Sequence, residues 1–398
     1  MKRRIDVSDK EITFGSALRI IPDWPERTML EYDPHLPARC NDVILGEVDR
    51  IPSEKEIYEF RDDGVEKFFR QGHKVRFGIE RIKPGWVAIA VGNRYAPRSI
   101  TGGLVNPITG KTNGQIIGGT ILFNICAFNV AGFVNTVTPA GRFLTPIKVL
   151  GTLTEADGRP LSLLNYPKRF TGHPSHSFKG VLVCGAMMES GKTSCCIAIM
   201  RTLRAIGKRA TYEKKTGTAC FSDPVRVLRG DIHCYGEAGQ SVEFDVLDLM
   251  AGDFVDGCGT VSDVSIASSM FVKRSVAFTH GFAAVHKTEV HIVELADNMA
   301  HTSNLALLRN TSFRSLFSHL VYVPSPSIDS AFHFLHYLRN EIGWSTIRVA
   351  FSGPLANDPE YRMLCEEIEH RLKVPCIRRD ETEGWLRWLY PRGGGKRC

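Results

Sequence analysis

The chain has no C-x-x-C pair, although it contains 11 cysteines. Disulfide frameworks and structural zinc sites need ordered cysteine spacing, so we expect reduced thiols in a core instead. No segment has the ~18 consecutive apolar residues that a membrane-spanning helix needs. The first residues, MKRRIDVSDKEITFG, are basic, but no apolar stretch follows them as it does in a secretory signal. The sequence therefore predicts a cytoplasmic protein that has no membrane partner.

The composition shows no strong excess of any residue class. Hydrophobic residues make up 43% and charged residues 23% of the 398 positions, which is ordinary for a soluble protein of two or three domains. The net charge of +7 is a modest positive excess. Such a charge suits phosphorylated ligands and nucleic acid equally well, so it does not choose between them.

Residues 178–210 have the pattern of a phosphate-binding loop between a strand and a helix. The central AMMESGKT fits G-x-x-x-x-G-K-[ST] with Ala186 at the first position, and Gly185 stands one residue earlier. An apolar run precedes the loop, and apolar residues at helical spacing follow it. This order is the setting that the motif requires. The predicted nucleotide-binding residues are Ala186, Met187, Met188, Glu189, Ser190, Gly191, Lys192, Thr193 and Ser194.

The loop predicts an anion site. Its N–H groups and the dipole of the following helix favour negative charge at the helix N-terminus. Lys192 is expected to neutralise the terminal phosphates as a catalytic residue, and the Thr193 hydroxyl to help hold Mg²⁺. The expected cofactors are Mg²⁺ and ATP or GTP. The chain has no N-K-x-D segment for base recognition, which favours ATP.

A lysine pair follows the next expected strand, at 208–213. Open α/β sheets bind ligands at the carboxyl ends of their strands, where this pair is expected to lie. A basic surface turn is an equally good interpretation. The predicted substrate-binding residues of this segment are Lys214, Lys215, Thr216 and Gly217.

Carboxylates in two later stretches are candidates for magnesium and substrate handling. An apolar run leads into closely spaced aspartates, of which Asp253 is a candidate substrate ligand and Asp256 a candidate catalytic base or metal ligand. Loop capping explains the same pattern equally well. The apolar stretch at 289–294 ends in Glu294, which we expect to be a catalytic residue that holds Mg²⁺ with Thr193. Asp297 is the second choice.

The remaining pattern predicts two domains. Short extended stretches separated by turns indicate a β-rich N-terminal domain over residues 1–169, for which a small barrel is one arrangement. A linker is expected at 170–177. An α/β domain with a mostly parallel sheet follows at 178–390, and a flexible tail at 391–398.

Two polar groups outside the loop allow a functional interpretation, although a plainer one is favoured for each. Arg94, Tyr95 and Arg98 would suit an anionic ligand or an interface, but they also fit a solvated exit from a strand. His173 and His176 have a spacing that could bind metal. They lack a carboxylate or cysteine partner nearby, so a linker is the simpler interpretation.

The segments around these candidates resemble known P-loop proteins. The loop, the KKTG segment and Glu294 together are similar to dethiobiotin synthetase and its relatives, although the spacing of KKTG is tighter than in that class. KKTGT, DFVDGCGTVS and VELADNMAHTSNLALL resemble a little-described bacterial P-loop family of unknown function that is related to a D-glutamate N-acetyltransferase. The resemblance covers about half of the chain and implies an ATP-type fold with Mg²⁺.

Three functions are compatible with these observations. The leading hypothesis is a Mg-ATP-binding enzyme, similar to a kinase or ligase, that transfers a phosphoryl group to a small-molecule substrate or activates it; a homo-oligomer is compatible with this. The second is a nucleotide-controlled interaction protein whose β-rich domain binds a partner or nucleic acid, although no aromatic-basic repeat supports it. The third is an acyl-coenzyme-dependent transferase whose loop binds a phosphorylated coenzyme.

Overall fold

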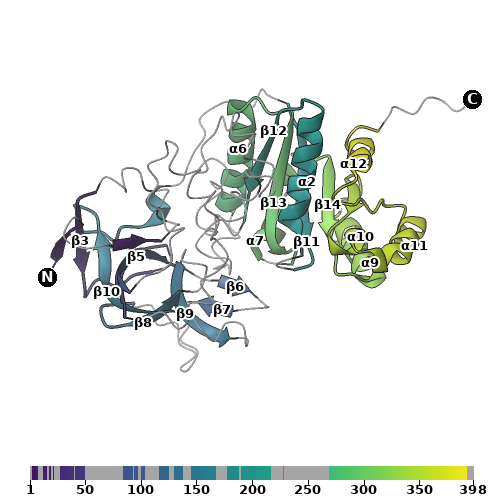
Figure 1. Ribbon diagram of the computed structural model, residues 1–398. Coiled ribbons are helices and arrows are strands. Elements are labelled where there is room, and N and C mark those ends of the chain that lie inside the picture. The colour runs from purple at the N-terminus through teal and green to yellow at the C-terminus, as the bar shows by residue number, and fades with distance from the viewer. Residues whose placement is uncertain are drawn as a thin grey trace, which may run out of the picture. The chain divides into compact units, whose positions relative to one another are not determined.

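The computed structural model forms two compact units, built mainly on residues 1–168 and on residues 169–216 and 267–398. They are described one at a time (Figure 1). The structure describes residues 2–7, 12–15, 18, 21, 27–39, 41–49, 84–92, 94–96, 100–103, 116–124, 130–137, 145–166, 177–187, 190–216, 227, 269–300 and 302–391. The sequence also predicts one helix in the N-terminal part, at 54–70, and it lies outside these residues. Among the helices that are described, none is both long enough and apolar enough to cross a membrane.

The first unit contains a closed barrel. Its strands are β1 (Arg3–Asp6), β2 (Ile12–Phe14), β3 (Met29–Asp33), β4 (Val43–Val48), β5 (Gly85–Val91), β6 (Arg94–Ala96), β7 (Ile100–Gly103), β8 (Ile121–Asn124), β9 (Val130–Val137) and β10 (Pro146–Thr154). β10 pairs with β4, β4 with β5, β5 with β9, β9 with β8, and β8 with β10. Because the last pairing returns to the first strand, these five strands close a ring, which removes their free edges. The predicted β-rich, barrel-like domain is confirmed.

The barrel is filled by apolar side chains from all five strands. Ile44, Ile89, Leu122, Ala131 and Ile147, one from each strand of the ring, are fully buried members of a single cluster. Neighbouring residues of β4 and β5 belong to a second cluster that includes residues of β1 and β3. Since both faces of β4 and β5 are covered, these strands read as continuous apolar runs and lack an apolar-polar alternation.

The second unit is a parallel α/β sheet. Its strands are β11 (Lys179–Gly185), β12 (Ala210–Lys214), β13 (Val290–Asn298), β14 (His319–Val323) and β15 (Arg348–Phe351). They lie in the order β12-β13-β11-β14-β15, and every pair is parallel. The chain first places β12 and β13 on one side of β11 and then β14 and β15 on the other. The strand order therefore reverses at β11, the position at which open α/β sheets bind ligands.

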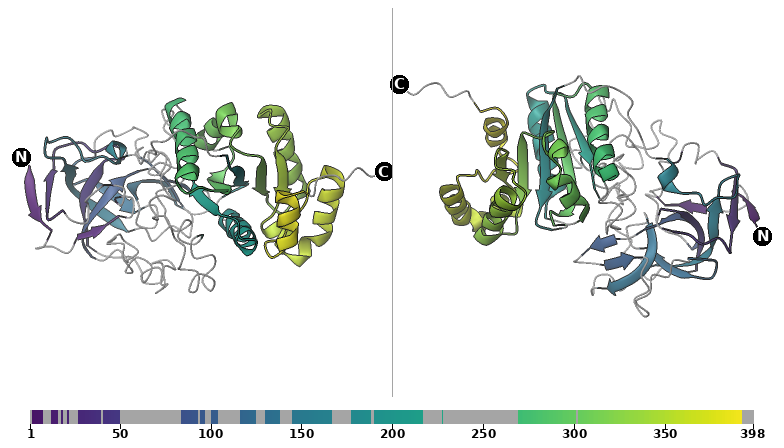
Figure 2. Two further views of the ribbon diagram at one scale, coloured as in Figure 1. Left: turned by 90° about the horizontal axis from the view of Figure 1, so that it is seen from above. Right: turned by 180° about the vertical axis from the view of Figure 1, so that it is seen from behind.

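Helices cover both faces of this sheet. They are α2 (Lys192–Ala205), α6 (Ser269–Val285), α7 (Thr302–Arg309), α8 (Thr311–Arg314), α9 (Ile328–His336), α10 (Pro354–Asn357), α11 (Arg362–Leu372) and α12 (Thr382–Leu389). Figure 2 shows α2 and α6 on opposite faces. On the α2 side, Val181, Val183 and Ile292 pack against the helix residues Cys195 and Ile199 in one buried cluster.

The expected elements of the second unit are present, with three differences. β13 runs on to Asn298, four residues beyond the expected end at Glu294. The apolar residues at 374–377 predict a last strand of the sheet, but this segment forms only a single bridge between Cys376 and Phe351. α12 was not anticipated from the pattern. Its apolar residues Trp385, Trp388 and Leu389 are buried against the α2 side of the sheet, so tertiary packing explains this helix better than local propensity does.

A buried histidine at the start of β14 makes the stability of this unit sensitive to acid. Burial, together with the nearby charges of Lys179 and Arg348, lowers the pKa of His319 to about 4 from its usual 6.5. Because the unfolded chain binds the proton more readily, the contribution of neutral His319 is complete above about pH 6.5 and is lost as the pH falls towards 4. Urea midpoints between pH 7 and 4 should therefore fall less steeply for His319→Gln than for the wild type. The exposed His333 provides the control, since His333→Gln should follow the wild-type profile.

Candidate phosphate-binding site

The predicted loop lies at the carboxyl end of β11, where the strand order reverses. β11 ends at Gly185, and α2 begins at Lys192 after Gly191, whose φ of 98° is in the left-handed region. A Cβ atom at Gly185 would lie 2.5 Å from Ser190 Oγ and 3.1 Å from Lys192 Cγ. The close return of the loop thus requires glycine at 185, while the Ala186 N–H donates to Val323 O of β14 at 2.9 Å. Ala186, at the first position of the motif, is thus held against β14.

Lys192 lies over the loop that precedes it. Its side chain is buried, and Nζ donates to Met187 O at 2.7 Å and approaches Ser190 Oγ at 3.5 Å. The N–H groups of the first turn of α2, which includes Ser194, add the partial positive charge of a helix N-terminus. Met188 and Glu189 lie outside the described residues. The arrangement concentrates positive charge at one spot, as the binding of a phosphate requires.

Glu294 connects this helix to the two neighbouring strands. Its carboxylate is 1% exposed, and Oε1 accepts hydrogen bonds from Thr193 Oγ1 at 3.1 Å and from Lys214 Nζ at 2.9 Å. Oε2 accepts from Tyr212 OH at 2.8 Å and from Cys196 Sγ at 3.6 Å. The parallel register explains the meeting, because Glu294 pairs with Val183 of β11 on one side and with Lys214 of β12 on the other. Three predicted site residues, Thr193, Lys214 and Glu294, are therefore brought together.

Lys215 lies on the opposite face of the sheet. Its ammonium is fully buried, forms an ion pair with Glu213, and donates to Ser275 O of α6 at 3.1 Å. Glu213 also contacts His291 Nε2 at 3.1 Å and accepts from Thr279 Oγ1 at 2.9 Å. Burial alone would raise the pKa of Glu213, but Lys215 and His291 outweigh it, and the pKa lies below its usual value. Successive strand residues point to opposite faces, so the two lysines separate.

Thr216 holds the end of β13 in place. Its hydroxyl donates to Asn304 Oδ1 at 2.8 Å and accepts from the Ala296 N–H at 2.8 Å. The Asn304 amide donates to Ala296 O at 2.6 Å and to Asn298 O at 2.7 Å. These bonds satisfy backbone groups just beyond Glu294, which explains why β13 continues there. Thr216 is a positioning residue in this arrangement.

Several other predicted positions cannot be placed. Gly217, Asp253 and Asp256 lie outside the described residues, as do Arg98, His173 and His176. Asp297 belongs to β13 and Arg94 and Tyr95 to β6, but their side chains are not among those described.

Sequence reasoning missed three contributions to the site. Tyr212 stands two residues before Lys214 on the same strand face, a spacing that would have placed both at Glu294. Cys196 is one helical turn after Thr193. Gly353 follows β15, and a Cβ there would lie 3.2 Å from Ser190 O, so the turn after β15 borders the loop. A Ser-Gly-Pro turn at the carboxyl end of a parallel strand is the signal that could have identified it.

The cysteines near the loop are thiols of the core. Cys184, Cys195 and Cys196 are free and buried. Burial raises the pKa of Cys184 to about 12 and that of Cys195 to about 11, and it also raises the pKa of Cys196. Thiols with such values are inert at neutral pH, so they support packing and do not act as nucleophiles.

Comparison with known proteins gives likenesses to solved structures only. A DUF1611 family protein from Anabaena variabilis is similar over 57% of this chain and 63% of its own length, with 12% identity and a TM-score of 0.33. This chain thus spans less than two thirds of that protein. The MinC:MinD cell division complex of Aquifex aeolicus matches 52% of this chain and 86% of its own, with 12% identity and a TM-score of 0.32. For a ParA family ATPase from Chlorobium tepidum the shares are 53% and 91%, with 14% identity and a TM-score of 0.29.

No family model matches the chain, and no curated protein does. At identities of this size the structural likenesses concern the fold alone. The interpretation of the loop therefore depends on the geometry around Lys192, Thr193 and Glu294.

Proposed function

We propose that the second unit binds a magnesium nucleotide, and that the chain is a P-loop enzyme that transfers a phosphoryl group to a small-molecule substrate or activates that substrate with ATP. The observation that carries the proposal is the 3.1 Å contact between Thr193 Oγ1 and Glu294 Oε1 at the end of a loop that Lys192 covers. A helix N-terminus, a lysine, a hydroxyl and a carboxylate then surround one spot. Phosphate with a divalent cation is the ligand that this combination suits.

The donor set is suited to Mg²⁺. This ion prefers oxygen ligands and is usually held by one or two carboxylates together with phosphate oxygens and water. The Thr193 hydroxyl and the Glu294 carboxylate are ligands of this type, and each lies beside the loop. When bound, the ion would supply positive charge that offsets the charge of the phosphates.

The lysines have separate roles in this proposal. Lys192 lies on the loop and is positioned to neutralise the phosphoryl group. Lys214 contacts Glu294 at the carboxyl end of β12, so it is the better of the two neighbouring lysines for orienting an acceptor. Lys215 anchors β12 to α6. Asp253 and Asp256 remain candidates for substrate contact and for the base.

Glu294→Gln should remove the magnesium dependence of nucleotide binding. In the wild type, ATP with Mg²⁺ at a hundred times its Kd should stabilise the fold by about 2.7 kcal/mol, and ATP without Mg²⁺ by less. In the variant the two conditions should give the same thermal midpoint, because the amide is a much weaker ligand for the ion than the carboxylate. Calorimetric titration of ATP with and without Mg²⁺ measures the same difference directly.

Two further variants make this result interpretable. Glu294→Gln also leaves Lys214 without its carboxylate, so the double variant Glu294→Gln, Lys214→Met tests whether any effect comes from the loss of that buried ion pair. Glu289→Gln removes a partly exposed carboxylate at the opposite end of the same strand region and should retain the magnesium effect. A Glu294→Gln protein that is folded and still responds to Mg²⁺ as the wild type does would contradict the assigned role of Glu294.

A further inference from the structure

A pocket of about 770 Å³ lies at the edge of the sheet beside β15, at the opposite end of that strand from the loop. Arg348 and Val349, the first residues of β15, line it, whereas Gly353, which borders the loop, follows the end of the strand. Residues 374–377 and α12 close its other sides. None of the residues that line it belongs to the phosphate-binding site.

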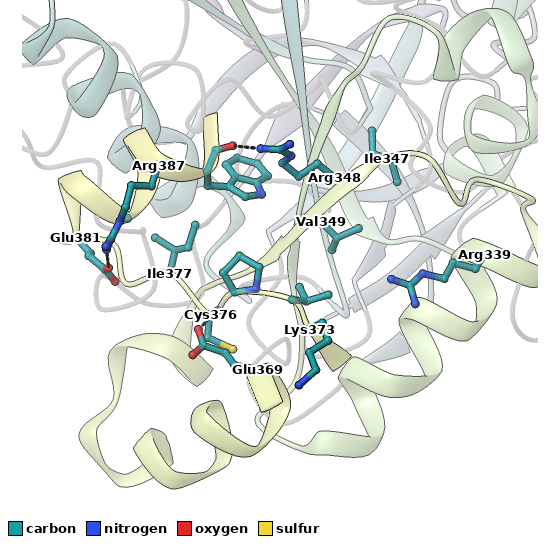
Figure 3. A pocket seen from close by; sticks show the side chains of 14 residues that line it. Arg339, Ile347, Arg348, Val349, Glu369, Lys373, Cys376, Ile377, Glu381 and Arg387 are labelled. Atoms are coloured by element: carbon teal, nitrogen blue, oxygen red, sulfur yellow. Dashed lines mark hydrogen bonds and ion pairs between the residues drawn. The ribbon is translucent and has the colours of Figure 1, made fainter. Parts of the chain in front are cut away.

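The pocket has an apolar floor and a positively charged rim. Ile347, Val349, Val374, Ile377 and Trp388 are each less than 9% exposed and line it. Its charged lining residues are Arg339, Arg348, Lys373, Arg387, Glu369 and Glu381. Four cations and two carboxylates leave two positive charges. Figure 3 shows Arg339 and Lys373 on one side of the pocket and Arg387 with Glu381 on the other.

The charges on the two sides of the pocket differ in their partners. Arg387 lies 3.4 Å from Glu381, and Arg348 donates to Trp388 O at 3.2 Å. Glu369 accepts the Cys376 N–H at 2.7 Å. Within the described part of the chain, by contrast, no carboxylate pairs with Arg339 or Lys373. An anion that entered the pocket would meet these two cations first.

Lys373 also has an unusual backbone. It ends α11 with a φ of 54°, in the left-handed region where glycine is the usual residue. A lysine there has a conformational cost that a glycine would not have. A cation is therefore present at the pocket rim at a position where glycine would give a more stable backbone.

Trp388 provides a buried donor that has no acceptor. The residue is 5% exposed, and its indole Nε1 has no hydrogen-bond partner among the described residues. A buried indole N–H usually has one. The main-chain carbonyl of Trp388 is already bonded to Arg348 and contacts His319 Nε2 at 3.2 Å, so the residue is fixed in place. Because the Nε1 atom is itself inaccessible, the ring contributes to the pocket as part of its apolar floor and not as a donor.

We propose that this pocket is a second ligand site, which binds a small organic dianion with an apolar body. The net charge of +2 favours a dianion, and the apolar floor favours a ligand with an apolar body. A volume of about 770 Å³ is within the usual range of small-molecule sites, about 300–1,000 Å³. The site is independent of the nucleotide site, and its proposal stands whether or not the loop binds ATP.

Phenyl phosphate is a suitable probe because it combines an aromatic ring with a dianionic group. Calorimetric titration into the full chain should show saturable binding of one equivalent. Lys373→Gly should weaken that binding roughly tenfold, because it removes one of the two cations for which the described residues provide no carboxylate partner. Phenol, which lacks the charge, and inorganic phosphate, which lacks the ring, should each bind at least tenfold more weakly than phenyl phosphate.

The variants are chosen so that misfolding does not imitate the expected result. Lys373→Gly suits the left-handed backbone and should unfold at the same temperature as the wild type or a higher one. Lys192→Ala separates this pocket from the loop, because it should leave the binding of phenyl phosphate unchanged.

Three outcomes would overturn the proposal. The first is no saturable binding of phenyl phosphate at millimolar concentration. The second is binding that Lys192→Ala abolishes and Lys373→Gly does not, which would place the probe at the loop. The third is binding of an extended acidic peptide alone. On the outer side of β15, the backbone of Phe351 pairs with residues 375–377, and the backbone of Val349, two residues earlier, faces the same way. A peptide could therefore pair with the edge of the sheet at Val349.

Discussion

Lys192→Ala is expected to reduce nucleotide-dependent turnover by about 100-fold or more while the protein stays folded. The lysine lies over the described part of the loop, where its ammonium is 2.7 Å from Met187 O. Its removal takes away charge where phosphate charge is proposed to lie. The variant is expected to stay folded, because the hydrogen bonds of this buried, charged side chain are worth about 1.5–3 kcal/mol each, less than the roughly 5–15 kcal/mol by which a domain is stable.

Thermal midpoints with ATP, GTP, ADP and acetyl-coenzyme A, each with and without Mg²⁺, measure the effect before any substrate is known. Stabilisation of the wild type by Mg-ATP and its loss in the variant would support the nucleotide site. Lys208→Ala is the matched control, since it removes the same charge from an exposed lysine near the start of β12. Full retention of nucleotide response in a folded Lys192→Ala protein would refute the proposal, and a response to acetyl-coenzyme A alone would favour acyl transfer.

The loop was predictable because its signal is local. A strand, a glycine-containing turn, Lys192 and an apolar helical face are contiguous in the sequence, and each follows from neighbouring residues. The alternation of strands and helices after residue 178 likewise predicts a parallel sheet. The contact between Thr193 and Glu294 could not be predicted in the same way, because it depends on β13 lying next to β11. A local sequence pattern does not show which strands are neighbours in a sheet.

Other features follow from packing that no short pattern records. Lys214 and Lys215 look alike in the sequence, and only the register of β12 against β13 decides which of them faces Glu294. The pocket beside β15 combines residues from 339 to 388 that share no motif. In the first unit, β1 and β3 were not anticipated because charged residues interrupt their apolar positions, as in RRID and MLEYD. Both strands lie at one end of the sheet, where polar residues are tolerated.

Lys215→Met should destabilise the second unit by about 3–5 kcal/mol, the usual cost of leaving one charge of a buried ion pair without its partner. Glu213 is fully buried and, among the described residues, would keep only His291 and Thr279 as neighbours that can bond to it. The double variant Glu213→Gln, Lys215→Met removes both charges and should recover much of the loss, because a buried pair replaced as a whole is often nearly neutral. Urea unfolding of the wild type, the single variant and the double variant measures this coupling.

The pH dependence distinguishes a lost charge partner from a simple packing defect. In the wild type Lys215 helps to hold the pKa of Glu213 below its usual value, so the pair contributes stability above the unfolded pKa. Without Lys215, burial should raise that pKa, and acid would then protonate the folded carboxyl and reduce the difference between Lys215→Met and the wild type. A packing defect would cost the same at pH 7 and pH 5. Lys208→Met, which breaks the exposed pair with Glu289, should have a small effect at either pH. If Lys215→Met and Lys208→Met had the same free energy of unfolding, the pair of Lys215 with Glu213 could not be what anchors β12 to α6.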